Sequence, residues 1–229
     1  MEVMSTGNDR FRVGSWRGDP GVGYLMPLTR IGPGAIDTAL RNMHREGYRR
    51  IVTGALAHEE QGPFLRQGFR VHERLHLLKH DLRSLPFTTA KVSMRRGWRR
   101  DRGPAIDIDN RAFDDFWRFD DASFKEALEA TPVSRFRVST RPDRVVSGYT
   151  ISGRAGRTGY LQRLAVDPAQ QGEGIGSALI VDTLSWLVRR GCVSALVNTQ
   201  ESNSGAFELY QRLGFEPVVP GLAVLEIEL

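Results

Sequence analysis

Apolar residues recur along the chain at spacings that predict several helices. Three- and four-residue spacing predicts helices over residues 35–46, 176–190 and 204–213. Residues 107–130 are expected to be mostly helical, with a break near Asp120, and residues 62–67 to form a short helix. The longest predicted helix, residues 176–190, carries one continuous apolar stripe: Leu179, Ile180, Thr183, Leu184, Leu187 and Val188.

Between these helices lie short runs rich in β-branched and aromatic residues, which predict strands. The predicted strands cover residues 11–16, 24–28, 48–56, 69–82, 91–98, 136–140, 145–151, 159–166, 193–199 and 222–229. Residues 83–90, which include Ser84 and Pro86, break the pattern and predict a linker. Strands that alternate with helices indicate an α/β fold built on a mixed sheet.

The two halves of the chain are similar to each other. Residues 31–47 and 175–191 have equal lengths and both end in Arg-X-Gly, and Leu65–Phe69 resembles Gln211–Phe215. We interpret this order of elements as a degenerate repeat rather than chance similarity between two amphipathic helices. The eight residues 167–174 are expected only in the second copy, and Tyr210 stands where the first copy has Phe64.

Composition narrows the class of protein. The chain has 229 residues, 40% of them hydrophobic, which is enough for one large or two small domains. Its single cysteine, Cys192, excludes an internal disulfide and a zinc site of several thiolates, and we expect it to be inert packing. No apolar run is long enough to span a bilayer, and residues 1–12 lack the apolar run of a secretory signal. We therefore expect a soluble, cytoplasmic protein with no membrane partner.

The net charge is +5, and 29 of the 32 basic residues are arginines. Such a surface suits anionic partners, but a high-GC genome, which encodes arginine in place of lysine, is the explanation that composition alone favours. The densest basic run interleaves Trp98 with arginines: Arg95, Arg96, Arg99, Arg100 and Arg102. This combination is found in proteins that bind single-stranded nucleic acid, yet an exposed strand edge is often charged in the same way. We expect the edge, and no nucleic-acid partner.

Residues 171–176 (QGEGIG) lie between a predicted strand and a predicted helix. Glycines at alternate positions permit positive φ and let a phosphate approach the main chain. The N-terminus of the following helix favours an anion, and a pyrophosphate fits such a loop. The segment is neither a P-loop nor a Gly-X-Gly-X-X-Gly turn. A purely structural turn has the same composition, so the loop alone leaves both interpretations open.

Flanking residues make the loop more specific. Leu164–Pro168 (LAVDP), Gln171–Leu179, Asn203, Leu209–Tyr210 and Leu213–Phe215 together resemble the signature of the GNAT superfamily of N-acetyltransferases. The resemblance implies a splayed mixed sheet that opens in a V after the strand at residues 160–166. It also implies a catalytic GNAT domain at residues 86–229 and a degenerate partial copy at residues 1–85.

The same resemblance implies a site for acetyl-CoA, with the pantetheine arm along the main chain of Leu164 and Val166 and the pyrophosphate on the loop. The implied contact residues are Leu164, Ala165, Val166, Gln171, Gly172, Glu173, Gly174, Ile175, Gly176, Ser177 and Asn203. Asn203 is equally suited to cap the following helix. No metal is implied. His72, His76 and His80 repeat every four residues, but on a strand this spacing does not form a metal site.

Tyr210 matches the family's general acid, which protonates the leaving CoA thiolate, although it could instead be a core residue. A phenol stays protonated at neutral pH because its ordinary pKa is about 10. In the ribosomal-protein alanine N-acetyltransferases, which residues 86–229 most resemble, a glutamate serves as general base where this chain has Asn198. Glu201 is the carboxylate nearest in sequence. The other acidic candidates are Asp109, Asp114 and Asp115, most of them expected to be solvated.

Three functional hypotheses follow from these residues. The first is an N-acetyltransferase that passes acetyl from acetyl-CoA directly to an amine, either a peptide or protein N-terminus or a small amine. The second is a catalytically silent GNAT fold that senses acyl-CoA or acts as a scaffold, which the missing glutamate favours. The third is an arginine-rich nucleic-acid binder. The acceptor amine and the oligomeric state are not encoded in any motif.

Overall fold

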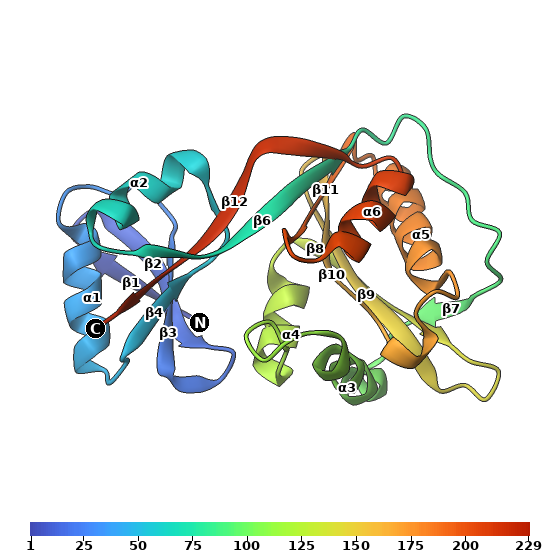
Figure 1. The fold of residues 1–229 in the computed structure, drawn as a ribbon, viewed down its shortest axis with the longest axis horizontal. Helices are drawn as coiled ribbons and strands as arrows, with labels where there is room; N and C mark the ends of the chain where they lie inside the picture. The colour runs from blue at the N-terminus through green and yellow to red at the C-terminus, as the bar shows by residue number, and fades with distance from the viewer. The chain divides into compact units, whose positions relative to one another are not determined.

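The computed structural model describes residues 1–229, which form two compact units. The first unit comprises residues 1–77, 198–203 and 218–229, and the second comprises residues 78–197 and 204–217. The chain passes between the units along three strands (Figure 1): β6 (Arg70–His80), β11 (Ser194–Gln200) and β12 (Glu216–Glu228). The functional division near residue 85 stays a prediction, because these units are defined by contacts alone.

The first unit is a small mixed sheet with two helices. Strands β1 (Glu2–Thr6), β2 (Asp9–Trp16) and β3 (Asp19–Pro27) are antiparallel neighbours. Strand β3 pairs in parallel with β4 (Arg50–Thr53), and β12 pairs antiparallel with both β4 and β5 (Leu56–Ala57). Helices α1 (Ala35–Arg45) and α2 (His58–Arg66) contribute to one apolar core. Its fully buried members include Phe11, Leu25, Ala39, Met43, Ile51 and Phe64.

The second unit is larger and follows the same plan. Strands β7 (Ser93–Arg96), β8 (Val133–Thr140), β9 (Val146–Ala155) and β10 (Thr158–Val166) are successive antiparallel neighbours. Strand β7 lies at the edge of the sheet, after an irregular segment of residues 81–92 (Figure 1).

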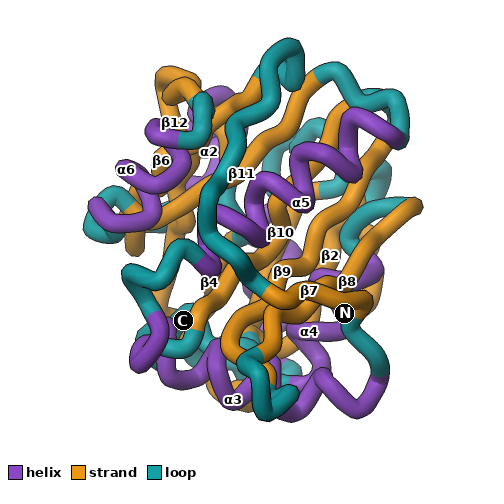
Figure 2. The backbone as a smooth tube through the Cα atoms, turned by 90° about the vertical axis from the view of Figure 1, so that its right-hand side faces the viewer, coloured by secondary structure: helices purple, strands orange, loops and turns teal.

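Two separate apolar cores pack on this sheet, and each is supplied by its own pair of helices. Helices α3 (Arg102–Ala112) and α4 (Asp121–Glu129) share one core with β8 and β9. Helices α5 (Ile175–Arg189) and α6 (Ser204–Arg212) share the other with β11 and the start of β10. In Figure 2, α5 crosses the sheet over β8, β9 and β10.

The predicted helices and strands are confirmed in order, but several bounds differ. Helix α2 begins four residues before its predicted start, and the strand predicted at residues 48–56 is divided into β4 and β5. Strand β1 was not predicted because most of its side chains are exposed and give no apolar alternation. Helix α3 begins five residues before the predicted position, within the basic run. The turn that starts it is closed by Asp101, whose carboxylate accepts the Trp98 N–H at 2.8 Å. The pattern of apolar residues does not predict that interaction.

The repeat is present in the structure. The order β3–α1–β4–α2–β6 recurs as β10–α5–β11–α6–β12, with a parallel strand pair in each copy. Phe64 packs edge-on against Phe69 with ring centroids 5.2 Å apart, and Tyr210 packs in the same way against Phe215 at 5.6 Å. In both copies a left-handed glycine follows the helix, Gly68 (φ 94) and Gly214 (φ 83). The copies therefore match even in their turns.

The prediction that only the second copy has a loop at residues 167–174 is wrong. Residues 28–34 fill the corresponding place between β3 and α1. The shortened element is the helix, because α1 has 11 residues and α5 has 15. Pro33 and Gly34, the latter at φ 74, delay the start of α1, so the equal spacing to Gly47 and Gly191 conceals the lost turn.

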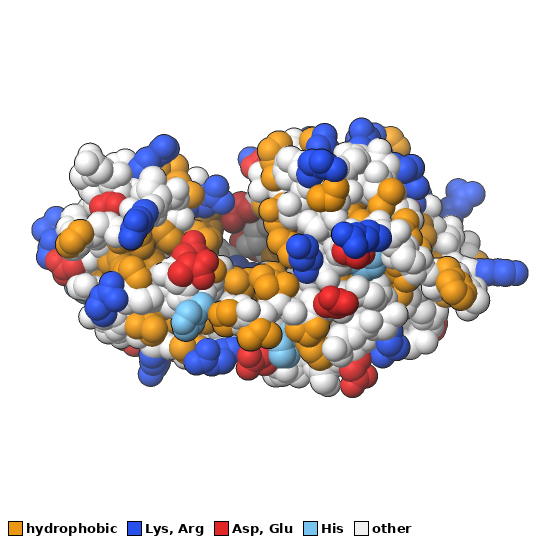
Figure 3. Space-filling view, turned by 90° about the horizontal axis from the view of Figure 1, so that it is seen from above, with side chains coloured by type: hydrophobic (Ala, Val, Ile, Leu, Met, Phe, Trp, Pro, Cys, Tyr) orange, Lys and Arg blue, Asp and Glu red, His pale blue; other side chains and the backbone are white.

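Basic side chains occur on both units in the face seen in Figure 3, rather than on one of them alone. None of the helices is both long enough and apolar enough to cross a membrane.

Candidate functional site

The central feature of the second unit is the separation of two parallel strands. Strands β10 and β11 pair only at Thr158↔Ser194, Gly159↔Ala195 and Tyr160↔Leu196. Beyond that point β10 continues to Val166, and β11 continues to Val197 within this unit, without pairing with each other. A register shift between Leu161 and Arg163 interrupts the β9–β10 ladder at the same level. The predicted V-shaped opening is therefore present, but it begins within β10, directly after Tyr160, rather than after the strand at residues 160–166.

The edge of β10 that faces this opening carries main-chain groups not used by β11. The N–H of Asp167 donates to the carbonyl oxygen of Ser147 on the β9 side at 2.9 Å. Successive residues of a strand direct their N–H and C=O groups to opposite edges, so those of Leu164 and Val166 face the opening. The Val166 carbonyl oxygen accepts from Nε2 of Gln171 at 3.3 Å.

The glycine-rich loop leads directly from this edge into α5. Gly172 (φ 86) and Gly174 (φ 79) are both left-handed, and Gly174 is the N-cap residue. No side chain caps α5, so the N–H groups of its first turn have no side-chain acceptor. A Cβ on Gly172 would meet open space, whereas one on Gly174 would lie 2.7 Å from Cβ of Ala90. The loop thus presents main-chain donors without overlying side chains at Gly172.

The start of the loop is held by Asp167. Its carboxylate accepts the Ala169 N–H at 3.1 Å and a hydrogen bond from Nη2 of Arg111 at 2.8 Å. These contacts hold the pKa of Asp167 below its usual value against the opposing effect of desolvation. The carboxylate therefore stays charged and fixes the point where β10 turns into the loop.

Tyr210 lies on α6, within the core that α5 and α6 share, and only 5% of its surface is exposed. Burial raises the pKa of its hydroxyl well above its usual value, while the positive charge of Arg163 acts in the opposite direction. The phenol is therefore protonated at neutral pH. Leu209, next to it, lies 3.2 Å from the position of a Cβ on Gly176, so α6 packs against the start of α5.

Other predicted site residues lie elsewhere. Glu201 is exposed, and its N–H donates to the carbonyl oxygen of Arg74 at 3.1 Å. Asn203 directly precedes α6, and its N–H donates to the carbonyl oxygen of Gln200 at 3.0 Å. By their contacts both residues, with the exposed Asn198, belong to the first unit. Their roles toward the loop stay predictions.

Among the acidic candidates, Asp109 is not solvated but completely buried. Its carboxylate accepts hydrogen bonds from Arg163 (Nε 2.7 Å, Nη2 2.8 Å), from the Tyr149 hydroxyl at 2.5 Å and from the Phe119 N–H at 2.8 Å. Burial, and then the charge of Asp109, raise the pKa of Tyr149 well above its usual value. With every acceptor position used, Asp109 is unavailable as a general base.

The remaining acidic candidates hold local structure. Asp114 accepts the Trp117 N–H at 3.1 Å, and Asp115 forms an exposed ion pair with Arg118. Neither lies within the core that contains Tyr210.

The sequence did not single out Arg163, whose guanidinium lies 3.5 Å from the ring centroid of Phe113 and 4.1 Å from that of Phe119. Only 9% of its side chain is exposed. An arginine beside the apolar run Leu164–Val166, in a chain whose helix α3 carries Asp107 and Asp109, was the available signal for a buried pair.

Comparisons with known proteins agree with this geometry. Residues 99–215 match the acetyltransferase (GNAT) family. A mycothiol acetyltransferase from Streptosporangium roseum is 42% identical over 57 residues, which are 25% of this chain and 17% of the relative. The curated mycothiol acetyltransferases are therefore matched over well under half of their length, 41% in the case of Thermomonospora curvata.

Solved structures show the same fold at low identity. A tandem GNAT protein from the clavulanic acid biosynthesis pathway superposes with a TM-score of 0.70 and 14% identity, over 99% of this chain and 81% of that one. The ribosomal-protein-S18-alanine N-acetyltransferase from Escherichia coli gives a TM-score of 0.50 and 21% identity, over 60% and 93% of the two chains. With a family match over half of its length and a tandem arrangement of the same fold, the chain belongs to the acetyltransferase (GNAT) family.

Proposed function

We propose that this chain is an N-acetyltransferase that passes acetyl from acetyl-CoA directly to an amine. The observation that carries the proposal is the separation of β10 from β11 beside a loop of left-handed glycines. An extended arm fits along the open edge at Leu164 and Val166. A diphosphate fits the main-chain donors of residues 171–177. When bound there, acetyl-CoA supplies the acetyl group as a reactive thioester.

The residues of this chain are proposed to bind acetyl-CoA and to protonate the leaving group. Peptide groups of β10 orient the arm, and the loop with the N-terminus of α5 holds the negative charge. Tyr210 keeps its proton because burial raises its pKa, and it donates that proton to the departing sulfur. Leu164, Ala165, Val166 and Asn203 are the proposed contacts outside the loop.

The amine must lose a proton before it attacks. Asn198, at the place of the relatives' glutamate, cannot accept one, because an amide is not basic at neutral pH. We propose Glu201 for this role, since it is exposed and directly follows the end of β11. An amine that arrives neutral needs no base at all.

The chemistry is proposed for residues 86–229, with residues 1–85 as a non-catalytic companion. The first copy has Phe64 in place of Tyr210, so it lacks the phenol. The acceptor is proposed to be a small amine or a peptide or protein N-terminus. Similarity to a mycothiol acetyltransferase and to a ribosomal-protein-S18-alanine N-acetyltransferase is the reason for keeping both classes in the proposal.

The test is Tyr210→Phe, assayed by release of free CoA with a panel of small amines and peptides. Loss of a general acid is expected to lower kcat about 100-fold or more, with CoA binding unchanged within about twofold. Tyr48→Phe is the matched control, because its hydroxyl lies in the first unit, 3.3 Å from Oγ of Ser15.

Two other outcomes would change the proposal. CoA binding by the wild type without turnover of any amine would favour the silent acyl-CoA sensor. Equal turnover by the wild type and Tyr210→Phe would leave Tyr210 as a core residue only.

A further inference from the structure

A cavity in the second unit is lined by many arginines. Its volume is about 890 Å³, within the range of small-molecule sites, and it lies between β7, β8 and the end of α5. Six of its thirteen lining residues are arginines and none is acidic. The arginines are Arg96, Arg99, Arg102, Arg135, Arg137 and Arg190.

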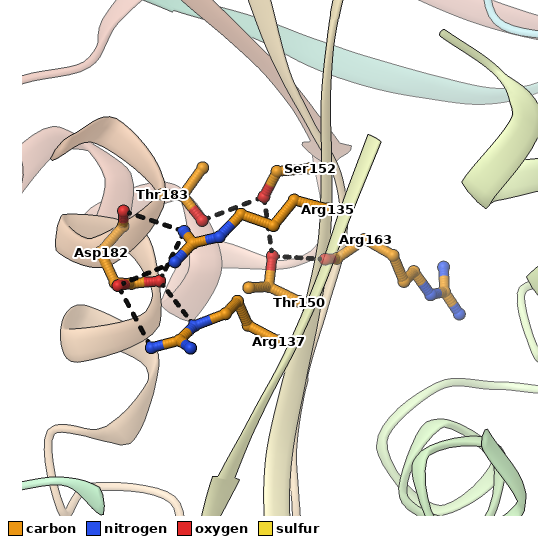
Figure 4. Close-up of polar contacts among 7 residues, drawn as sticks. All are labelled: Arg135, Arg137, Thr150, Ser152, Arg163, Asp182 and Thr183. Atoms are coloured by element: carbon orange, nitrogen blue, oxygen red, sulfur yellow. Dashed lines mark hydrogen bonds and ion pairs between the residues drawn. The ribbon is translucent and has the colours of Figure 1, made fainter. Parts of the chain in front are cut away.

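Two of these arginines are held by a single carboxylate (Figure 4). Asp182 on α5 binds Nη1 of Arg135 at 2.7 Å and Nε of Arg137 at 3.1 Å. Burial lowers the pKa of Arg135, and Asp182 opposes that effect, so the guanidinium stays charged. Both arginines reach toward α5, whereas the side chain of Arg163 leaves the sheet on the opposite face (Figure 4).

The same close-up shows why this wall of the cavity is firm. The Ser152 hydroxyl lies 3.0 Å from that of Thr183 on α5, and the Thr150 hydroxyl donates to the Arg163 carbonyl oxygen at 3.0 Å. These buried hydroxyls connect the sheet to α5 beside Asp182. The guanidinium groups above them are therefore placed in advance of any ligand.

The other four arginines, Arg96, Arg99, Arg102 and Arg190, form no ion pair with a carboxylate. Only two of the six guanidinium groups thus have a carboxylate partner. Like charges gathered in this way repel one another unless an anion joins them, and arginine binds phosphate through paired N–H groups.

Aromatic rings distinguish this cavity from a purely ionic one. Trp98 is 52% exposed at the cavity, and the guanidinium of Arg96 lies 5.1 Å from its ring centroid. Trp186 forms a buried wall with Arg135 above it at 5.6 Å. A planar base can stack on an exposed tryptophan while arginines bind the phosphate, whereas the carboxylates of an acidic peptide do not stack on the ring.

We propose that this cavity binds a nucleotide through its phosphate and its base, either free or within a single strand. The site is separate from the glycine-rich loop. Trp186 follows Ile175 by eleven residues on α5, so the two lie about 16 Å apart along the helix axis at 1.5 Å per residue. It therefore does not depend on the acetyltransferase proposal.

The test measures binding of a fluorescein-labelled ten-residue oligouridylate to the full chain by anisotropy, with ATP as a competitor. Arg99→Glu/Arg190→Glu is expected to weaken binding at least about tenfold, because two phosphate contacts become repulsive. Trp98→Ala is expected to weaken it at least about fivefold through lost stacking. Arg45→Glu/Arg66→Glu, on exposed positions of the first unit, carries the same net charge and should change binding less than about twofold.

Competition by ATP distinguishes a free nucleotide from a single strand as the ligand. Displacement by ATP indicates that a free nucleotide is sufficient, and resistance to ATP indicates that a strand is required; either result supports the site. The proposal is overturned by absence of saturable binding, or by equal losses in the two double variants. It is also overturned if polyglutamate binds as tightly as the oligonucleotide, or if excess CoA displaces the probe while Trp98→Ala has no effect.

Discussion

Asp109 shows how much a single buried carboxylate can organise. It joins α3 to β9 and β10 through Tyr149 and Arg163, in a place where no water reaches it. Removing one partner of such a pair leaves an uncompensated charge in the core, which costs far more than the pair itself contributes. The pair therefore makes this part of the fold sensitive to small chemical changes.

Asp109→Asn keeps the shape of the side chain but removes its charge. We expect the free energy of unfolding to fall by about 3–5 kcal/mol, because Arg163 stays buried without a counter-charge. Urea denaturation followed by circular dichroism measures the change. Asp115→Asn, whose side chain is 89% exposed, should stay within about 0.5 kcal/mol. Similar losses in the two variants would contradict a special role for Asp109.

Much of this site was predictable from local sequence, and the rest was not. The loop at residues 171–176 and the helix that bears Tyr210 follow from spacing within one short segment. The pairing of Asp109 with Arg163 joins residues 54 positions apart, and apolar periodicity carries no information about such partners. The arginine cavity likewise brings together three segments that are distant in sequence, and only the basic run at residues 95–102 was recognisable from sequence.

At the scale of elements, the two copies differ in how their first helix begins. Both start after a left-handed glycine, Gly34 in one and Gly174 in the other, but only α5 follows a second left-handed glycine at Gly172. At Gly174 the loop also lies close to Ala90 in the irregular segment before β7. The position therefore requires glycine for two reasons, its φ angle and its lack of a side chain.

Gly174→Ala and Gly172→Ala separate these reasons. Each substitution carries the cost of a left-handed alanine, about 1–2 kcal/mol. Gly174→Ala adds a Cβ 2.7 Å from that of Ala90, and we expect about 1–3 kcal/mol of further destabilisation from overpacking. Thermal unfolding provides the measurement. Ala90→Gly in the Gly174→Ala background should recover the additional loss; failure to recover any of it would exclude the contact as its cause.

At the scale of the whole molecule, two tyrosines link stability to alkaline pH. Burial raises the pKa of Tyr149 and of Tyr210 well above the unfolded value near 10. Above that pH the unfolded chain releases protons that the folded chain retains. Stability therefore falls as the pH rises, while below it these groups have no effect.

This dependence can be measured by denaturation between pH 8 and about pH 11. The wild type is expected to lose stability progressively above about pH 10. Tyr210→Phe should lose less free energy of unfolding over that interval than the wild type, whatever its stability at pH 8, because it lacks one of the two tyrosine hydroxyls whose pKa is raised by folding. A Tyr210→Phe slope equal to that of the wild type would show that this hydroxyl titrates normally.

The last strand has a consequence for how the protein is made. The end of β12 completes the sheet of the first unit, with Glu226 opposite Val52, Ile227 opposite Ile51, and the Leu225 N–H donating to Oγ1 of Thr53 at 2.9 Å. These residues are translated after the whole second unit. During synthesis the sheet of the first unit stays incomplete until β12 has been translated, so the edge of β4 is unpaired. Chaperones can bind this exposed apolar strand during that time.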